Sequence, residues 1–378
     1  MGQGMRQFTR LTSRRVLVAA AVAIATLQVI AQPAAAFEKG FWGPTRTPEG
    51  RSAFPIYEKL GVTLYQIQLR WDLVAPTRPE RERDPNDPAY QWPSDVSYAI
   101  RQAKKHDMKV LLMIIGAPKW AHIYDAAAND PPYWRQAPHP RPYARFARAA
   151  SRRYPSVRHW MVWGEPDRGN NWQPHSYKKP GEPLDKLSKG AVHRYARMLD
   201  AAYGELKRER RKNIVIGGNT FSYGQIRAWQ WVRNMRVRGR PPRMDLYGHN
   251  PFGARAPDFR KPPSTENGSD FSDLRRFGRH VQRYLGRPRK RRIRLFLSEW
   301  TIPTGPNSEW DYYVTGKTQA RWIRQGFRLA RRERNIVGLG WIHLYDEAPR
   351  PDGERRRRGG LIHHDGKRKP GFRAFKRG

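Results

Sequence analysis

The chain has 378 residues and no cysteine, with 73 Lys and Arg against 33 Asp and Glu and a formal net charge of +40. The absence of cysteine excludes a disulfide framework, so the core alone must hold the fold together. The basic residues are spread along the chain and no nucleic-acid-binding motif is present, which argues against a nucleic-acid-binding module; the surplus indicates an arginine-rich proteome or an anionic partner.

The first 36 residues have the layout of a secretory signal peptide. A basic start precedes an apolar run, Val16–Ala31, and the small residues Ala34 and Ala36 predict cleavage after Ala36. The run is short for a transmembrane span, so we expect no membrane span after cleavage. The pair Arg14-Arg15 before an apolar stretch resembles a twin-arginine export signal, with an ordinary signal peptide or an uncleaved anchor as alternatives. We therefore expect a secreted protein whose residues 37–378 form one domain.

Eight short apolar runs alternate with longer amphipathic ones after residue 36. The expected strands are rich in Val, Ile, Leu and aromatic residues: one around Gly40–Gly43, then Val62–Leu69, Lys109–Ile115, Arg158–Trp163, Asn213–Ile216, Met244–Tyr247, Ile293–Leu297 and Ile336–Leu344. Helical patterns cover 94–107, with Ser94 as N-cap, and 191–210, 273–286 and 318–333. Strands separated by helices predict an α/β protein with a parallel sheet.

The parallel sheet could be an open doubly wound sheet or a closed barrel. No glycine-rich phosphate loop follows the first expected strand, and polar residues of catalytic type follow many different strands. In a barrel all the strand ends converge on one face, which accounts for that distribution. The sequence therefore predicts a single (β/α)8 TIM barrel as the catalytic domain.

Long loops follow the second, third and fourth expected strands, on the side of a barrel where active sites lie. These loops carry many aromatic residues: Trp92, Trp120, Tyr124, Tyr133, Trp134, Trp172 and Tyr177. Such side chains either stack on the apolar faces of sugar rings or pack against one another.

Two glutamates end strands on opposite sides of the expected barrel. Glu165 follows the fourth strand in VWGEPD, and Glu299 follows the seventh in LSEW. Either acid alone is more typical of a structural or solvated side chain, but together they match the pair of carboxylates that glycosidic hydrolysis requires. Glu165 would hold the proton as general acid and Glu299 would stay ionised, and a separation of about 5–5.5 Å would imply retention of configuration.

At these residues the chain resembles the glycoside hydrolases of clan A, the retaining (β/α)8-barrel enzymes that include families 5 and 39. The resemblance implies that Glu165 is the acid/base and Glu299 the nucleophile. The clan has an Asn before the acid/base that bonds the sugar 2-hydroxyl, whereas this chain has Gly164. That departure leaves the configuration of the substrate at this position open.

The resemblance extends along the chain and implies further substrate-binding residues. They are Arg70 at the end of the second strand, Trp120 in GAPKWA, Trp163, Gly164 and Trp300 beside the glutamates, His249 near the end of the sixth strand and Trp341 in the eighth. Arg70 either replaces an Arg that related sequences have nearer Gln66 or is a surface charge. His249 and Trp341 also have an interpretation as core residues.

The leading hypothesis is a secreted, retaining glycoside hydrolase that acts on a poly- or oligosaccharide, an anionic glycan being one option. A glycan-binding barrel without turnover and a polyanion or cell-wall binder are the alternatives. We expect a monomer without a cofactor. We expect no metal site either, since His363-His364 lack further ligands at metal spacing. Of two basic runs, residues 287–294 precede the seventh strand, whereas Arg355–Arg358 follow the eighth and could hold an anionic polymer near the active site.

Overall fold

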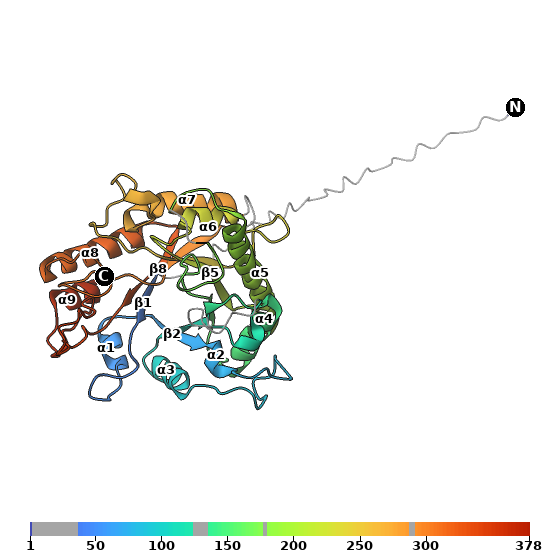
Figure 1. Ribbon diagram of the computed structural model, residues 1–378, viewed down its shortest axis with the longest axis horizontal. Helices are drawn as coiled ribbons and strands as arrows, with labels where there is room; N and C mark the ends of the chain where they lie inside the picture. Colours follow the sequence, from blue (N-terminus) through green and yellow to red (C-terminus); the bar gives the residue numbers. More distant parts are fainter. Residues whose placement is uncertain (2–36, 124–134, 177–179, 287–291) are drawn as a thin grey trace. The chain divides into compact units, whose positions relative to one another are not determined.

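The computed structural model describes residue 1 and residues 37–123, 135–176, 180–286 and 292–378. The described residues from Phe37 on belong to one compact unit. Its eight parallel strands form a closed barrel in the order β1 to β8, with β8 paired to β1 (Figure 1). The predicted (β/α)8 TIM barrel is therefore confirmed.

All eight expected strands are present. Their bounds are β1 Glu38–Trp42, β2 Leu64–Arg70, β3 Lys109–Ile115, β4 His159–Val162, β5 Ile214–Phe221, β6 Leu246–Asn250, β7 Arg294–Leu297 and β8 Ile336–Ile342. The fifth and sixth strands run on to Phe221 and Asn250, beyond the ends expected from the sequence. The difference arises because glycines and polar residues interrupt the apolar runs there while the backbone stays paired in the barrel.

The helices surround the barrel. Their bounds are α1 Phe54–Lys59, α2 Trp71–Val74, α3 Ser94–Lys105, α4 Pro140–Arg153, α5 Lys186–Glu209, α6 Ala228–Asn234, α7 Leu274–Leu285, α8 Gly316–Arg332 and α9 Pro370–Arg377. The four predicted helices are α3, α5, α7 and α8. The prediction of Ser94 as an N-cap is wrong, because Pro93 holds that position in an extended conformation and Ser94 is already helical. None of the described helices is long and apolar enough to cross a membrane.

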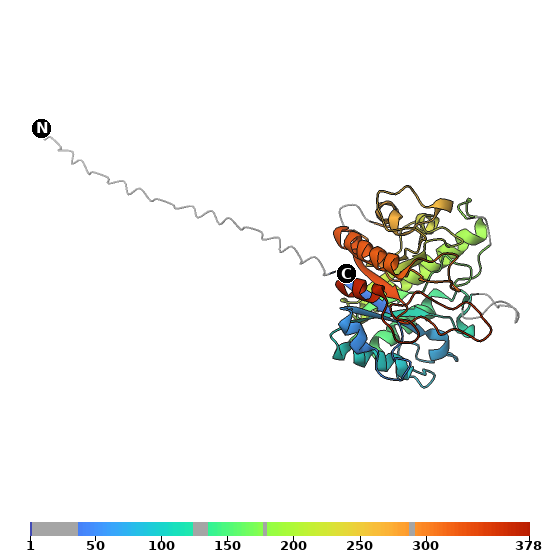
Figure 2. The same ribbon diagram turned by 90° about the vertical axis from the view of Figure 1, so that its left-hand side faces the viewer.

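The helix α8 illustrates how local sequence sets this architecture. The Thr315 side chain caps its first turn by accepting a hydrogen bond from the backbone N–H of Thr318. Ala320, Ile323 and Phe327, spaced three and four residues apart, form the buried stripe that faces the sheet. The C-terminal α9 then packs beside α8 (Figure 2), with the ring centroid of Phe375 5.2 Å from that of Phe327.

The core has two parts. The barrel interior is filled by apolar side chains from six of the strands: Leu64, Leu111, Met113, Met161, Ile216, Phe296 and Val337. A larger cluster fills the space between the strands and the surrounding helices. Because these apolar residues fill the barrel, polar side chains gather at the carboxyl ends of the strands, where the active sites of this fold lie.

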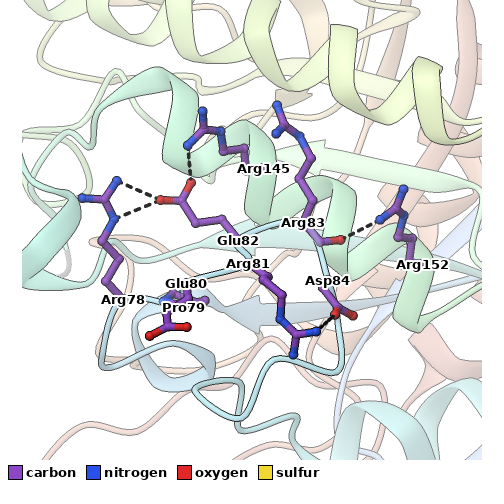
Figure 3. Close-up of a pocket in the computed structure, with 9 residues that line it drawn as sticks. All are labelled: Arg78, Pro79, Glu80, Arg81, Glu82, Arg83, Asp84, Arg145 and Arg152. Carbon is purple, nitrogen blue, oxygen red and sulfur yellow. Dashed lines mark hydrogen bonds and ion pairs between the residues drawn. The ribbon is translucent and has the colours of Figure 1, made fainter.

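The loop that joins α2 to α3 is fastened by ion pairs (Figure 3). Arg78 and Arg145 both bind Glu82, at 3.0 and 2.9 Å between nitrogen and oxygen. Arg83 lies 2.9 Å from Glu205 of α5. Residues of this network line a cavity of about 530 Å³. Part of the large surplus of arginine therefore holds this loop against α4 and α5.

Candidate active site

Glu165 and Glu299 leave the carboxyl ends of β4 and β7. The chain around Glu165 is unusual, because Trp163 and Glu165 have φ angles of 68° and 43°, in the left-handed region that non-glycine residues rarely adopt. The backbone N–H of Glu165 donates to the carbonyl of Asn219 at 3.0 Å, which fixes this turn against β5. Strained backbone of this kind is typical of functional sites. Both glutamates are 8% exposed.

Amide and hydroxyl groups from three strands hold the two glutamates together. Asn250, the last residue of β6, donates from Nδ2 to Glu165 Oε1 at 2.9 Å. Its Oδ1 lies 2.7 Å from Ser298 Oγ, and Ser298 precedes Glu299. The same hydroxyl lies 2.6 Å from Oδ1 of Asn219, so its single proton serves one of the two amides at a time. The network thus spans from β4 to β7 and connects both acids.

The electrostatics of the two glutamates differ. Burial and the negative charge of Glu165 raise the pKa of Glu299 well above its ordinary value, while a hydrogen bond from Asn250 and the charge of Arg168 oppose the rise. Arg168 binds Glu165 directly, with Nη1 2.6 Å from Oε2.

The surroundings of the two acids differ from those expected from the sequence. We expected Glu165 to hold the proton and Glu299 to be ionised, but the guanidinium lies on Glu165 and burial acts on Glu299. The expectation that Glu299 stays ionised is therefore opposed by its buried surroundings, whereas the acid role of Glu165 stays a prediction.

Three of the tryptophans expected to contact substrate are core residues. Trp163 and Trp341 are 0% exposed and Trp300 is 2% exposed. The rings of Trp300 and Trp341 pack edge to face at 5.6 Å. Trp163 packs in the same way on Trp172 and donates from Nε1 to the carbonyl of Asn171. The prediction that these three rings contact sugar is therefore corrected, because in the structure they fill the layer between strands and helices.

His249 is also a core residue. Its Nδ1 lies 2.9 Å from Thr220 Oγ1 and its Nε2 lies 2.7 Å from the carbonyl oxygen of Ser269. The ring packs on Phe277, and burial lowers the pKa of His249 to about 4. Both ring nitrogens are thus engaged within the protein, so the substrate contact predicted for His249 is corrected as well.

Arg70 and Trp120 lie nearer the surface and keep their candidate status. Arg70 forms a two-pronged ion pair with the buried Asp72, at 2.8 and 2.6 Å, and its side chain is 31% exposed. Trp120 is partly buried, packs edge to face on Trp71, and donates from Nε1 to the carbonyl of Ala75 at 2.9 Å. A role of either residue in substrate binding stays a prediction.

Gly164 is a glycine for a steric reason. A Cβ atom at this position would lie 2.9 Å from the sulfur of Met113, which fills the barrel interior beside it. The Asn of clan A therefore has no room here unless Met113 moves.

Some aromatic residues of the long loops pack on other rings, and the rest lie outside the described residues. The partly buried Trp92 stacks on Phe146 and the buried Trp172 packs on Tyr195, which is the mutual packing considered from the sequence. Tyr124, Tyr133, Trp134 and Tyr177 lie outside the described residues.

Of the two basic runs, residues 287–291 lie outside the described part of the chain. In the second run, Arg356 and Arg357 both pair with Glu347, so part of its charge is already compensated. The described residues hold no group of three or more His, Asp or Glu side chains that could bind a metal ion.

Several residues of the site were missed from the sequence. Asn219, Asn250 and Ser298 all stand at or near strand ends. The available signals were that Asn250 and Ser298 are each next to a predicted site residue in the sequence, and that Asn219 ends the sequence GGN. Arg168 and the ring of Phe221, which lies under its guanidinium at 4.8 Å, gave no signal because their contact depends on how the β4–α5 loop folds back.

No protein-family model matches the sequence, and no curated protein matches it. Solved structures do match. A family 39 glycoside hydrolase from the gut symbiont Bacteroides cellulosilyticus is 17% identical with a TM-score of 0.61, over 91% of this chain and 63% of that one. A glucosidase from Croceicoccus marinus is 16% identical with a TM-score of 0.60, over 90% and 67%. A monomeric β-xylosidase from Caulobacter crescentus is 16% identical with a TM-score of 0.58, over the same shares.

This chain thus spans about two thirds of the length of those structures. At these identities the likeness establishes the fold, and the expected resemblance to clan A barrels of family 39 is confirmed at that level.

Proposed function

We propose that this protein is a retaining glycoside hydrolase that cleaves O-glycosidic bonds of a poly- or oligosaccharide. The observation that carries the proposal is the pair of carboxylates from β4 and β7, joined at the mouth of the barrel through Asn250 and Ser298. The fold shared with family 39 glycosidases supports it.

In the proposed mechanism Glu299 attacks the anomeric carbon while Glu165 protonates the leaving oxygen. The glycosyl-enzyme ester on Glu299 is then hydrolysed by water that Glu165 deprotonates, so each carboxyl group returns to its starting state. A separation of about 5–5.5 Å between the two carboxyl groups would favour this double displacement over inversion, which needs a wider gap for water.

Replacement of the two acids tests the roles. Glu299→Gln should lower kcat/KM on aryl glycosides by at least about 10⁴-fold, because the amide cannot form the ester. Glu165→Gln should retain the first step on dinitrophenyl glycosides, whose leaving group needs no proton, and show a burst followed by slow turnover. Glu333→Gln is a matched control, since Glu333 pairs with Arg275 and stands before β8, at the opposite end of the barrel, and should leave the kinetics unchanged.

Product stereochemistry decides the mechanism. Proton NMR of the first product formed should show the anomer of the substrate, and the opposite anomer would contradict double displacement. Full activity of Glu299→Gln would refute the assignment of the nucleophile.

A glycan-binding barrel without turnover is the second candidate. Gly164 in place of the clan Asn and the Arg168–Glu165 ion pair favour it, because both depart from a site poised for acid catalysis. Under this alternative, the wild-type protein binds oligosaccharides with the same affinity as the Glu299→Gln variant does, and the wild type hydrolyses none of them.

We further propose that the protein acts outside the cytoplasm after removal of residues 1–36. In support, Phe37 belongs to the folded domain: its ring packs on Phe327 of α8, and the Arg331 guanidinium lies 4.7 Å from the centre of the same ring.

A further inference from the structure

Arg168 covers the carboxylate that is proposed to act as the acid. It lies three residues beyond Glu165, and its backbone N–H donates to the Glu165 carbonyl at 3.1 Å, so a tight turn sets the two side chains side by side. Nη1 lies 2.6 Å from Glu165 Oε2, and the guanidinium rests on the ring of Phe221. The Arg168 side chain is 37% exposed and can be reached by a ligand.

This contact opposes the first chemical step. The step needs a proton on Glu165 and a negative charge on Glu299, whereas Arg168 forms an ion pair with the Glu165 carboxylate and burial raises the pKa of Glu299. The charged groups around Glu165 are Arg168 and Asp167 on its own loop and Glu299 from β7. Burial raises the pKa of Asp167, so Arg168 is the charge whose displacement changes the site.

A neutral sugar is poorly suited to displace Arg168. Hydrogen bonds between a guanidinium and a carboxylate are about twice as strong as those between neutral groups, so hydroxyl groups compete weakly with Glu165. A second anion competes on equal terms, because its oxygens match the same fork of donors.

Two further arginines lie beside this one. Arg70 ends β2, and its Nε lies 3.1 Å from the Cβ position of Gly116 at the end of β3. Arg135 accepts a hydrogen bond at its carbonyl from Gln173, on the loop that carries Arg168. Burial, followed by the positive charges of Arg168 and Arg70, lowers the pKa of Arg135, so these three charges act on one another. We call Arg70, Arg135 and Arg168 the arginine cluster.

We propose that the arginine cluster is an anion subsite, and that the substrate is an acidic glycan whose carboxylate or sulfate binds Arg168 and frees Glu165 for acid catalysis. The inference rests on the proposed function and specifies its substrate class. The formal net charge of +40 agrees with it, since a positive field attracts polyanionic glycans.

The proton balance of the site is complete without any added reagent. When the substrate anion pairs with Arg168, the proton held by Glu299 moves to Glu165. Glu299 is then the ionised nucleophile and Glu165 the neutral acid, as the first step requires. Acid catalysis is thereby coupled to recognition of the charge, which makes Arg168 a determinant of specificity.

Matched pairs of nitrophenyl glycosides test the proposal. Glucoside and glucuronide, and galactoside and galacturonide, differ only in the carboxylate, and both anomers of each are assayed. A 6-sulfated glucoside separates sulfate from carboxylate as the preferred anion. The proteins are wild type, Arg168→Gln, Arg168→Lys and the control Arg243→Gln, whose Arg243–Asp200 ion pair lies before β6, away from the mouth.

We expect wild type to prefer the acidic member of a pair by about 10- to 100-fold in kcat/KM, the range of a charged hydrogen bond. Arg168→Gln should lose this preference, and its kcat/KM on the neutral glycoside should rise toward that on the acidic one, because the cation that opposes protonation of Glu165 is gone. It should also move the basic limb of the neutral-substrate pH profile to higher pH, because Glu165 then keeps its proton longer. Arg168→Lys should recover part of the preference, and Arg243→Gln should behave as wild type.

Equal losses on both members of a pair, with an unmoved pH profile, would make Arg168 a structural residue and overturn the proposal. A wild-type preference for the neutral members would overturn it too, while the proposed function would stand. If wild type hydrolyses no glycoside, the proposed function fails, and calorimetric titration with glucuronate and methyl glucoside then decides the inference. Acid-selective binding lost in Arg168→Gln supports the anion subsite, and equal binding of the two sugars refutes it.

Discussion

Asn250→Ala is the substitution that most directly probes the coupling of the two glutamates. Asn250 is 0% exposed, donates to Glu165 at 2.9 Å and lies 2.7 Å from the hydroxyl of Ser298. A hydrogen bond to a charged group contributes about 1.5–3 kcal/mol, and each 1.36 kcal/mol corresponds to a factor of ten in rate. If that bond positions the carboxylates in the transition state, kcat/KM should fall by about 10- to 150-fold.

The pH profile of Asn250→Ala gives the sign of the effect. Its hydrogen bond lowers the pKa of Glu299, so its loss raises that pKa further. The nucleophile must be ionised, and activity disappears as the pH falls through its pKa. The acid limb of kcat/KM on an activated aryl glycoside should therefore move to higher pH.

Asn213→Ala is the matched control. Asn213 is also 0% exposed and also makes two hydrogen bonds, to Ser151 and to the carbonyl of Leu206, but it stands at the opposite end of β5. Both variants should lose about 1–3 kcal/mol of unfolding free energy in urea. Only Asn250→Ala should change the kinetics. Equal pH profiles for the two variants, or an acid limb moved to lower pH by Asn250→Ala, would refute the reasoning.

Three further predictions concern the interior and the mature end. Gly164→Asn should lower the unfolding free energy measured in urea by about 1–3 kcal/mol, because its Cβ would lie 2.9 Å from the Met113 sulfur. Adding Met113→Ala should relieve the strain. An unchanged unfolding free energy of Gly164→Asn alone would contradict this prediction. Burial lowers the pKa of His249 from 6.5 to about 4, so the stability from its neutral ring is complete above pH 6.5 and is lost as the pH falls toward 4. His249→Gln should therefore reduce the acid-induced loss of unfolding free energy by up to about 3 kcal/mol, measured by urea titrations at several pH values. A loss as steep in the variant as in the wild type would contradict this prediction. N-terminal sequencing of exported protein should begin at Phe37, and retention of earlier residues would indicate an anchor.

The barrel and its two acids could be predicted because their signals are local. The expected strand Lys109–Ile115 coincides with β3, since an uninterrupted apolar run between polar neighbours marks a buried strand. Glu165 and Glu299 were found because each follows such a run directly. Asn219 and Asn250 were not, because the strands that present them continue through glycine and polar residues.

The direction of side chains could not be predicted, because it depends on irregularities in pairing. Side chains along a strand alternate between its two faces. Since Val337 faces the barrel interior, regular alternation would direct Trp341 inward as well. A register shift between β7 and β8 pairs Phe296 with Gly338, which reverses the alternation and turns Trp341 toward α9. In the same way the left-handed backbone at Trp163 directs its ring outward.

The ion pairs of the α2–α3 loop make the order of that loop depend on the salt of its surroundings. Arg78 and Arg81 are 61% and 63% exposed, so dissolved ions screen their pairs readily, whereas Glu205, which anchors Arg83, is only 9% exposed. The outer turn of the loop therefore loosens at a lower salt concentration than its inner anchor. Brief trypsin treatment should cut after Arg81 increasingly as sodium chloride is raised, while the bond after Arg83 stays protected. The flank of the barrel formed by α4 and α5 would thus carry a loop whose mobility follows the ionic strength of its surroundings.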